Sequence, residues 1–273
     1  MIFMENLQKI ANNMRINIVK MVHANKSGHP GGALSCADIL TALYFNAMDI
    51  NKDNLKDTVR DKFVLSKGHA SAAIYAVLAE KGFIPFEELK TFRAINSNLQ
   101  GHPNMLDCPG VDVSSGSLGQ GLSVGVGMSL ANKLEGNDFR TYVLCGDGEL
   151  QEGQIWEAAM AAAHFNLDNL VLIIDYNGLQ IDGYNRDVMN IRPVGDKFKA
   201  FGWQTVAVDG HDIESIIAGL NYAKTVKGQP AVIIAETVKG KGVSFMEDKA
   251  GWHGKALSDE ELAIALKELG GNN

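Results

Sequence analysis

The chain has 273 residues, 46% of them hydrophobic, and a formal net charge of −7 at pH 7. This length and hydrophobic content allow one large domain with a substantial core, while the acidic balance and scattered Lys and Arg exclude a nucleic-acid groove. There is no basic and apolar leader and no apolar run near 18 residues, so we expect neither export nor a membrane partner, and predict a cytoplasmic protein.

The first half of the chain has mainly helical spacing of apolar residues. We predict a turn at 27–32 and a short strand at 63–66, with helices at 5–23, 36–46, 71–81 and 86–93. Residues 95–117 are expected to be mostly irregular. A loop this long in a compact domain is usually functional or disordered, and its Gly and Pro content favours an ordered functional segment.

A helix over 119–134 contains Gly121, Gly125 and Gly127. Each glycine costs up to about 1 kcal/mol of helix propensity. We therefore expect another segment to approach this helix closely.

In the second half, strand and helix patterns alternate. We predict strands at 141–145, 170–175, 203–208 and 231–236, and helices at 150–165, 194–201, 212–226 and 258–269. Ser258 and Glu261 form a capping-box pattern, and Asp212 is a good N-cap. This alternation is typical of a doubly wound α/β fold, with a mostly parallel sheet and helices on both faces. We expect a single domain over 1–273, in which 237–273 form a loop and a short C-terminal helix.

Two of the predicted strands end in an oxygen ligand. Asp147 follows the strand at 141–145, Asn177 follows the strand at 170–175, and residues 149–166 can form the crossover helix between them. The two side chains should then lie side by side at the carboxyl edge of the sheet. Together with a free backbone carbonyl, they make an incomplete shell of hard ligands that suits Mg²⁺ or Ca²⁺ on a diphosphate.

Each half of this pattern is by itself an ordinary turn signal, since Asp-Gly and Asn-Gly are common in turns. The two signals together, at the ends of two strands in a βαβ unit, indicate a ligand site more specifically than either one alone. No G-x-G-x-x-G opens the helix after a first strand, so NAD is not expected.

Four of the seven histidines lie in loop-like Gly or Pro surroundings: His29, His69, His102 and His253. Loops at one end of a rigid sheet carry site residues, and a neutral imidazole donates, accepts or shuttles a proton near pH 7. Together they predict a proton-handling pocket. Each one alone can equally cap a turn. The other three, His23, His164 and His211, are interpreted as structural.

The three cysteines, Cys36, Cys108 and Cys145, are scattered and odd in number. They match neither a disulfide framework nor a zinc site, and we interpret them as reduced thiols without a chemical role.

Five motifs occur in the order and spacing of the transketolase family, whose diphosphate-binding domain the whole chain resembles. They are Ser27-Gly-His-Pro-Gly31, Lys67-Gly-His-Ala70, Gly101-His-Pro103, Gly116-Ser-Leu-Gly-Gln-Gly121 and Gly146-Asp-Gly148, with Glu152, Asn177, Lys239-Gly-Lys-Gly-Val243 and His253. The resemblance implies thiamine diphosphate and a divalent ion (Mg²⁺, Ca²⁺ or Mn²⁺) as cofactors. It also implies ketol transfer between sugar phosphates, as in the pentose phosphate pathway.

The resemblance also implies roles for single residues. The metal would be held by Asp147, Asn177 and the backbone oxygen of Leu179. The cofactor would be contacted by Gly148, His69, His253, Gly116, Leu118 and Asn177, while Glu152 reaches across a subunit interface. His29, His102 and His253 would face the substrate, with His69 beside the thiazolium, and 239–242 would form a loop over the mouth of the site.

The similarity covers only one of the three domains of a complete transketolase. The chain is therefore expected to need a separately encoded C-terminal subunit with the pyrimidine-binding domain, in an α2β2 heterotetramer. The Gly-rich helix at 119–134 would allow close approach between protomers.

Two alternatives remain open. One is another ketol-transferring thiamine diphosphate enzyme, such as a dihydroxyacetone synthase-like or 1-deoxyxylulose-5-phosphate synthase-like protein, although the two Gly-His-Pro histidines favour transketolase over the latter. The other is a non-catalytic module that only binds cofactor or a partner.

Overall fold

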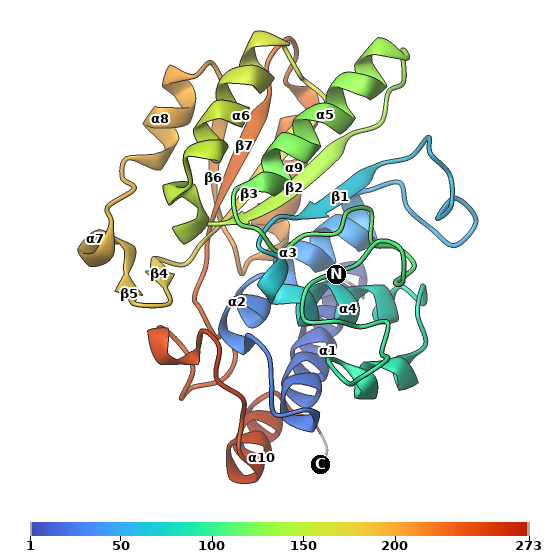
Figure 1. The fold of residues 1–273 in the computed structure, drawn as a ribbon, viewed down its shortest axis with the longest axis vertical. Helices are drawn as coiled ribbons and strands as arrows, with labels where there is room; N and C mark the ends of the chain where they lie inside the picture. The colour runs from blue at the N-terminus through green and yellow to red at the C-terminus, as the bar shows by residue number, and fades with distance from the viewer. Residues whose placement is uncertain (1, 272–273) are drawn as a thin grey trace.

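One sheet of five parallel strands forms the centre of the computed structural model, which describes residues 2–271 (Figure 1). The strand order is β1-β2-β3-β7-β6. The bounds are β1 Lys62–Leu65, β2 Thr141–Gly146, β3 Leu170–Tyr176, β6 Gln204–Asp209 and β7 Ala231–Glu236. Strands β2 and β3 are almost wholly buried and rich in Val, Leu and Ile, as expected for a parallel sheet covered on both faces.

Helices cover both faces of this sheet, so the doubly wound α/β prediction is confirmed (Figure 1). On one face lie α5 (Gln120–Leu134), α6 (Gly153–His164) and α8 (Val194–Ala200). On the other lie α3 (Ala37–Ala42), α4 (Ser71–Glu80) and α9 (Ile213–Thr225), with α1 (Ile2–Ala24) packed against α3 and α4. Successive strand residues such as Val143 and Leu144 belong to opposite hydrophobic clusters, because strand side chains alternate between faces.

The remaining elements are short. They are the α-helices α2 Pro30–Ser35 and α7 Asn185–Val188, the hairpin strands β4 Leu179–Gln180 and β5 Gly183–Tyr184, the π-helix η1 Leu43–Ala47, and the 3₁₀-helices η2 Gly68–Ala70, η3 Phe86–Thr91, η4 Gly148–Gln151 and η5 Ala250–Trp252. Residues 95–117 contain no helix or strand, as expected.

The predicted turn at 27–32 and helix at 36–46 are partly wrong. Helix α2 already begins at Pro30, whose fixed φ suits the first helical position. Cys36 then leaves helical geometry and separates α2 from α3, and the last turn of the segment widens into η1. The two glycines at 31–32 have a low helix propensity, which explains why the sequence pattern predicts a turn where α2 forms.

The crossover helix expected over 149–166 is also shorter than predicted. After β2 the chain first forms η4, and Glu152 is extended, with ψ 127°, before α6 begins at Gly153. The Glu149 side chain is drawn toward the sheet edge and accepts hydrogen bonds there, which accounts for the separate 3₁₀ turn.

The chain's own sheet lies close to the Gly-rich helix α5, so the predicted close approach is found within the chain, while contact of this helix with another protomer stays a prediction. A Cβ added at Gly121 would lie 2.5 Å from Ser66 Cβ, and one added at Gly125 would lie 2.5 Å from Val143 Cγ2. Among the glycines of α5, only Gly127 would place an added Cβ in open space. The missing side chains therefore let α5 sit tightly on β1 and β2.

The C-terminal helix α10 (Asp259–Glu268) packs against α1 and begins with the expected capping box at Ser258 and Glu261. Asp212 likewise caps α9 by accepting the amide hydrogen of Glu214. Among residues 2–271, no helix is both long and apolar enough to cross a membrane.

Candidate active site

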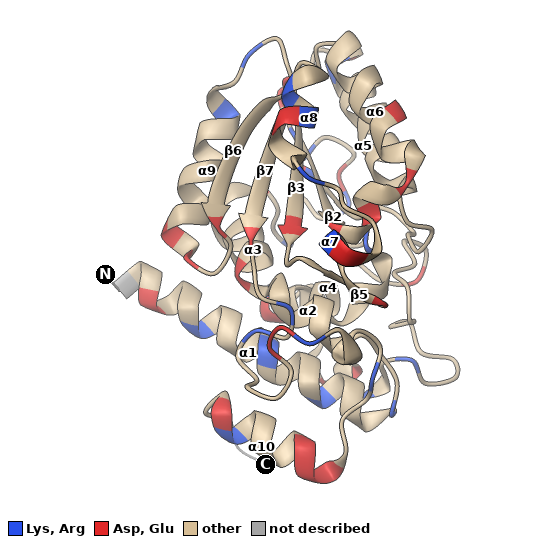
Figure 2. Ribbon diagram, turned by 90° about the vertical axis from the view of Figure 1, so that its left-hand side faces the viewer, with Lys and Arg blue, Asp and Glu red and all other residues tan. Residues whose placement is uncertain are grey.

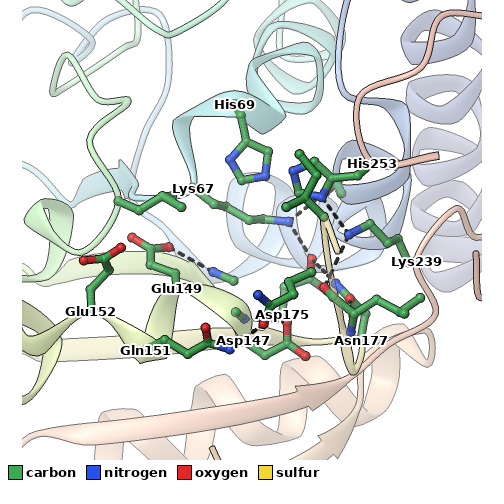
Figure 3. Close-up of a pocket in the computed structure, with 17 residues that line it drawn as sticks. Lys67, His69, Asp147, Glu149, Gln151, Glu152, Asp175, Asn177, Lys239 and His253 are labelled. Atoms are coloured by element: carbon green, nitrogen blue, oxygen red, sulfur yellow. Dashed lines mark hydrogen bonds and ion pairs between the residues drawn. The ribbon is translucent and has the colours of Figure 1, made fainter. Parts of the chain in front are cut away.

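A cavity of about 350 Å³ opens at the carboxyl ends of β2 and β3. Figure 2 shows acidic residues at the tips of β3, β6 and β7 on this side of the sheet. Figure 3 shows the lining side chains: His69 and His253 lie on one side, and Asp147, Asp175 and Asn177 lie opposite. This volume falls at the lower end of the usual range for small-molecule sites.

The two predicted oxygen ligands do meet in this cavity. Asp147 and Asn177 directly follow the paired strands β2 and β3, and both line the cavity together with Leu179 of β4. Asp147 is held by amides from both sides: Gly148 N–H donates to Oδ1 (2.8 Å) and Gly178 N–H to Oδ2 (2.5 Å). Asn177 Oδ1 accepts the amide hydrogen of Leu179 at 3.1 Å, which turns the chain into the hairpin.

The donors at this point fit a divalent cation. Burial, followed by the negative charge of Asp175, raises the pKa of Asp147 to about 6, so an ionised carboxylate here lacks a compensating charge. A carboxylate, an amide oxygen and the Leu179 carbonyl are hard ligands, and phosphate oxygens and water commonly complete such a shell. Residues 2–271 contain no cluster of three or more His, Cys, Asp or Glu arranged to hold a metal.

A buried ion pair lines part of the cavity. Lys67, on the loop after β1, donates to Asp175 Oδ2 of β3 (2.5 Å) and to the Gly32 carbonyl (2.6 Å), and the two side chains are 2% and 0% exposed. Ser35 and Thr237 also donate to this carboxylate. Asp175 therefore connects β3 with the three segments that carry Ser35, Lys67 and Thr237. These bonds and the Lys67 charge outweigh burial and lower the pKa of Asp175.

Lys239 points into the cavity, although the sequence suggested only a loop over its mouth. Its Nζ lies 2.8 Å from His253 Nδ1 and 3.3 Å from the Leu179 carbonyl oxygen, and its side chain is almost fully buried. Burial lowers the pKa of Lys239 to about 8. The backbone is anchored as well, since Gly240 N–H donates to the Gly31 carbonyl at 3.0 Å.

Three of the four predicted site histidines form one cluster. The rings of His69 and His253 are stacked with centroids 5.0 Å apart, and His29 lies edge-on to both, at 5.3 and 5.6 Å. Burial is the main cause that lowers the pKa of His29 to about 4 and of His253 to about 3, with neighbouring cations adding to it. All three rings are therefore neutral near pH 7.

His102 lies near this cluster because the chain packs closely at two glycines. A Cβ at Gly116, which has φ 155°, would lie 3.0 Å from the His102 ring, and a Cβ at Gly68 would lie 2.8 Å from Gly116 N. Both positions therefore require glycine. The close approach that these glycines allow brings together the loops of His69, His102 and Gly116. His29, His102 and Gly116 border the cavity region without lining the cavity itself.

Glu149 holds three loops at the edge of the cavity. Its carboxylate accepts hydrogen bonds from Ser66 Oγ, from Gly119 N–H (2.8 Å) and from Gly146 N–H (3.1 Å). Leu118 and Glu152 line the same edge, and Glu152 is exposed.

The interpretation from sequence missed several residues of this region. Lys67 lies inside a motif assigned to His69, Asp175 is the last residue of a predicted strand, and Glu149 and Lys239 enter the sequence prediction only as the first residues of a helix and a loop. A charged residue beside a buried apolar run was the available signal for Lys67 and Asp175, since such a charge requires a partner.

The residues set aside as structural lie outside the cavity. The three cysteines are free and buried. His211 accepts the Val238 amide hydrogen at 2.8 Å, while its Nδ1 lies 2.9 Å from Asp38 Oδ2. His23 contacts Asp259, and His164 packs against Phe165.

The family model described as "Transketolase, thiamine diphosphate binding domain" matches residues 6–273.

Two similar proteins have nearly the same length as this chain, and both are named as transketolase subunits. The one from Phocaeicola vulgatus, named for apulose 4-phosphate, is 45% identical over 97% of this chain and 94% of its own length. The one from a Clostridium species, named for 6-deoxy-6-sulfo-D-fructose, is 42% identical over 97% of this chain and 96% of its own length.

A solved transketolase from Campylobacter jejuni superposes with a TM-score of 0.92 and 37% identity. The match covers 97% of this chain and 43% of the solved one.

Proposed function

Because the chain belongs to the transketolase family, as its thiamine diphosphate-binding domain, we propose that it forms one half of a two-subunit transketolase. This enzyme transfers a two-carbon ketol unit from a ketose phosphate to an aldose phosphate. The observation that carries the proposal is the meeting of Asp147, Asn177 and Leu179 oxygens opposite a cluster of neutral histidines in one cavity.

The metal ion is assigned to the oxygens of Asp147, Asn177 and Leu179. They lie where two parallel strands deliver them, and the raised pKa of Asp147 indicates a carboxylate that gains from a nearby cation. Mg²⁺ is the first candidate, and Ca²⁺ or Mn²⁺ suit the same oxygens.

Thiamine diphosphate supplies carbanion stabilisation, while the protein supplies position and proton management. The amide of Gly148, which donates to Asp147 in this structure, is assigned to the diphosphate. His69, His253 and Asn177, which line the cavity, are also assigned to the cofactor, and the backbone at Gly116 and Leu118 is assigned to the pyrimidine. Each of these assignments keeps the cofactor along the carboxyl edge of the sheet.

The substrate histidines are His29, His102 and His253. His102 is assigned to the C1 hydroxyl of the donor ketose, and His29 and His253 to the C3 hydroxyl, whose proton leaves as the C2–C3 bond breaks. Their neutral state near pH 7, which follows from the lowered pKa values, supports hydrogen bonding to uncharged hydroxyl groups.

The second half of the enzyme is a separately encoded C-terminal subunit with the pyrimidine-binding domain, in an α2β2 assembly. The names of the similar proteins, which are themselves called subunits, support such a partner. Glu152 is assigned to the contact with this subunit, and its exposure at the edge of the cavity supports the assignment.

Ketol transfer from xylulose 5-phosphate to ribose 5-phosphate tests the proposal, with thiamine diphosphate and Mg²⁺ present. We expect activity for the mixture of both subunits and none for this chain alone. Activity of the chain alone would refute the division between two subunits.

The identity of the donor calls for a panel of ketoses, since the two similar proteins are named for different sugars. Apulose 4-phosphate and 6-deoxy-6-sulfofructose should be compared with the pentose phosphates, and formation of dihydroxyacetone with formaldehyde as the acceptor tests the dihydroxyacetone synthase-like alternative. If no sugar reacts in a mixture that binds cofactor, the chain is a binding module and the catalytic proposal fails.

A further inference from the structure

Arg93 joins two of the histidine loops. Its guanidinium donates from Nη1 to Ser27 Oγ at 3.0 Å, and from Nη2 to His29 Nδ1 at 3.3 Å and to the Gly101 carbonyl at 3.4 Å. One side chain therefore contacts the segment before α2 and the segment that carries His102.

The residues around Arg93 leave room for its side chain and fix one of its hydrogen-bond acceptors. A Cβ on Gly101 would lie 2.8 Å from the guanidinium carbon, so the absence of a side chain there makes room for Arg93. Ser71 Oγ donates to the same Gly101 carbonyl at 2.8 Å and fixes it from the other side. Arg93 itself has φ 61°, a left-handed backbone conformation that is uncommon outside glycine and that costs conformational energy.

The hydrogen bond to His29 has only one possible direction. A guanidinium has donors and no acceptor, and it stays protonated throughout the working pH range. Nδ1 of His29 must therefore accept, and the single proton of the neutral ring lies on Nε2. That edge of the ring lies beside Gly254, next to His253, because a Cβ on Gly254 would lie 3.4 Å from His29 Nε2, and the rings of His69 and His253 are adjacent.

We propose that Arg93 is a positioning residue that holds His29 as the Nε2–H tautomer, so that His29 donates a hydrogen bond to a substrate oxygen. This inference refines the role given to His29 above and rests on that proposed function. The Nδ1 lone pair of His29 is directed at Arg93, so the ring presents a hydrogen-bond donor at Nε2.

The tautomer can be read directly by NMR of the full chain labelled with ¹⁵N-histidine. Couplings between ring protons and ring nitrogens identify the protonated nitrogen, and the His29→Gln spectrum assigns the signals of His29. We expect protonation on Nε2 alone in the wild type and a mixture of tautomers in Arg93→Ala. A wild-type signal from the Nδ1–H tautomer would overturn the proposal, whether or not Arg93→Ala folds, and this readout does not depend on ketol transfer.

Kinetics of the reconstituted enzyme give a second test. The side-chain amide of Gln places a donor near the position of Nε2, whereas that of Asn reaches only the position of Nδ1. His29→Gln should retain about tenfold more kcat/KM than His29→Asn, the value of roughly one hydrogen bond. If Asn equals or exceeds Gln, His29 is not the donor.

Arg93→Ala should lower kcat/KM by roughly 10- to 100-fold, as expected for loss of a residue that orients a site histidine. Lys90→Ala is the matched control, since Lys90 is an exposed cation on η3, three residues away, whose partner is Glu87. An equal loss in both variants would contradict the proposal. If no variant and no wild type shows activity, the proposed function fails while the NMR result still decides the tautomer.

Discussion

Lys67 and Asp175 form an ion pair with an Nζ–Oδ2 distance of 2.5 Å, and both side chains are buried in the wall of the cavity. The pair connects the loop after β1 with the end of β3, although β2 lies between these strands. Breaking a buried ion pair leaves an uncompensated charge, which is far more costly than replacing both partners.

Lys67→Met should therefore lower the free energy of unfolding by about 3–5 kcal/mol at pH 7. In the double variant Lys67→Met/Asp175→Asn, part of this loss should be recovered, because no charge remains unpaired. Urea unfolding of the wild type, the two single variants and the double variant measures the coupling. Additive losses would show that the two side chains do not depend on each other.

Asp147→Asn should abolish binding of thiamine diphosphate with Mg²⁺ and change the stability of the apo protein little, because the removal of a buried charge offsets the loss of one of the two hydrogen bonds from Gly148 and Gly178. The amide removes the charged metal ligand, and it also removes a carboxylate whose raised pKa shows that its ionised form is disfavoured by burial. Calorimetric titration of cofactor into the reconstituted pair and thermal unfolding of the apo chain measure the two effects.

Asp182→Asn is the control for Asp147→Asn, because Asp182 is an exposed acid in the turn between β4 and β5. The control should bind cofactor normally. Retention of wild-type affinity by Asp147→Asn would refute the metal assignment.

Two glycines of α5 provide a matched pair of variants. Gly127→Ala should stabilise the isolated chain by about 0.5–1 kcal/mol, since alanine is the better helix former and nothing lies within 4 Å of the added Cβ. Gly125→Ala should lower the melting temperature, because the added methyl group overlaps Val143 on β2. Thermal unfolding compares them, and the same sign for both would contradict the assigned contact with the sheet.

The histidine cluster should make the apo chain less stable as the pH falls. Burial and the charge of Lys67 hold the pKa of His69 far below its ordinary 6.5, so the folded chain keeps this ring neutral. The unfolded chain binds a proton below about pH 6.5, and stability is lost there as the pH decreases.

In His69→Gln, this part of the pH dependence should disappear. The drop in unfolding free energy between pH 7 and pH 5 should be smaller than in the wild type, as measured by urea unfolding at each pH. His164→Gln, which changes an exposed histidine on α6, should retain the wild-type dependence. An unchanged slope in His69→Gln would mean that His69 titrates normally in the folded chain.

The sheet and the meeting of Asp147 with Asn177 could be predicted because each rests on a short run of neighbouring residues. Apolar runs define β2 and β3, and the parallel arrangement then places their ends together. The contacts of Lys67 with Asp175 and of Arg93 with His29 join residues 108 and 64 positions apart, and no local pattern encodes such pairs.

Local conformation explains the remaining differences. Cys36 interrupts a run with good helical spacing, and Glu152 delays α6, because tertiary hydrogen bonds and packing outweigh propensity at these positions. The glycines of α5 correctly indicated a close approach, but their pattern does not distinguish the chain's own sheet from another protomer.

The three hydrogen bonds of Glu149 have a consequence for how this family can be redesigned. Ser66, Gly119 and Gly146 come from three separate segments, yet they share one carboxylate. A loop transplanted from a homologue keeps its shape only if it returns a donor to the same two oxygen atoms. The three segments should therefore be exchanged as one module with Glu149.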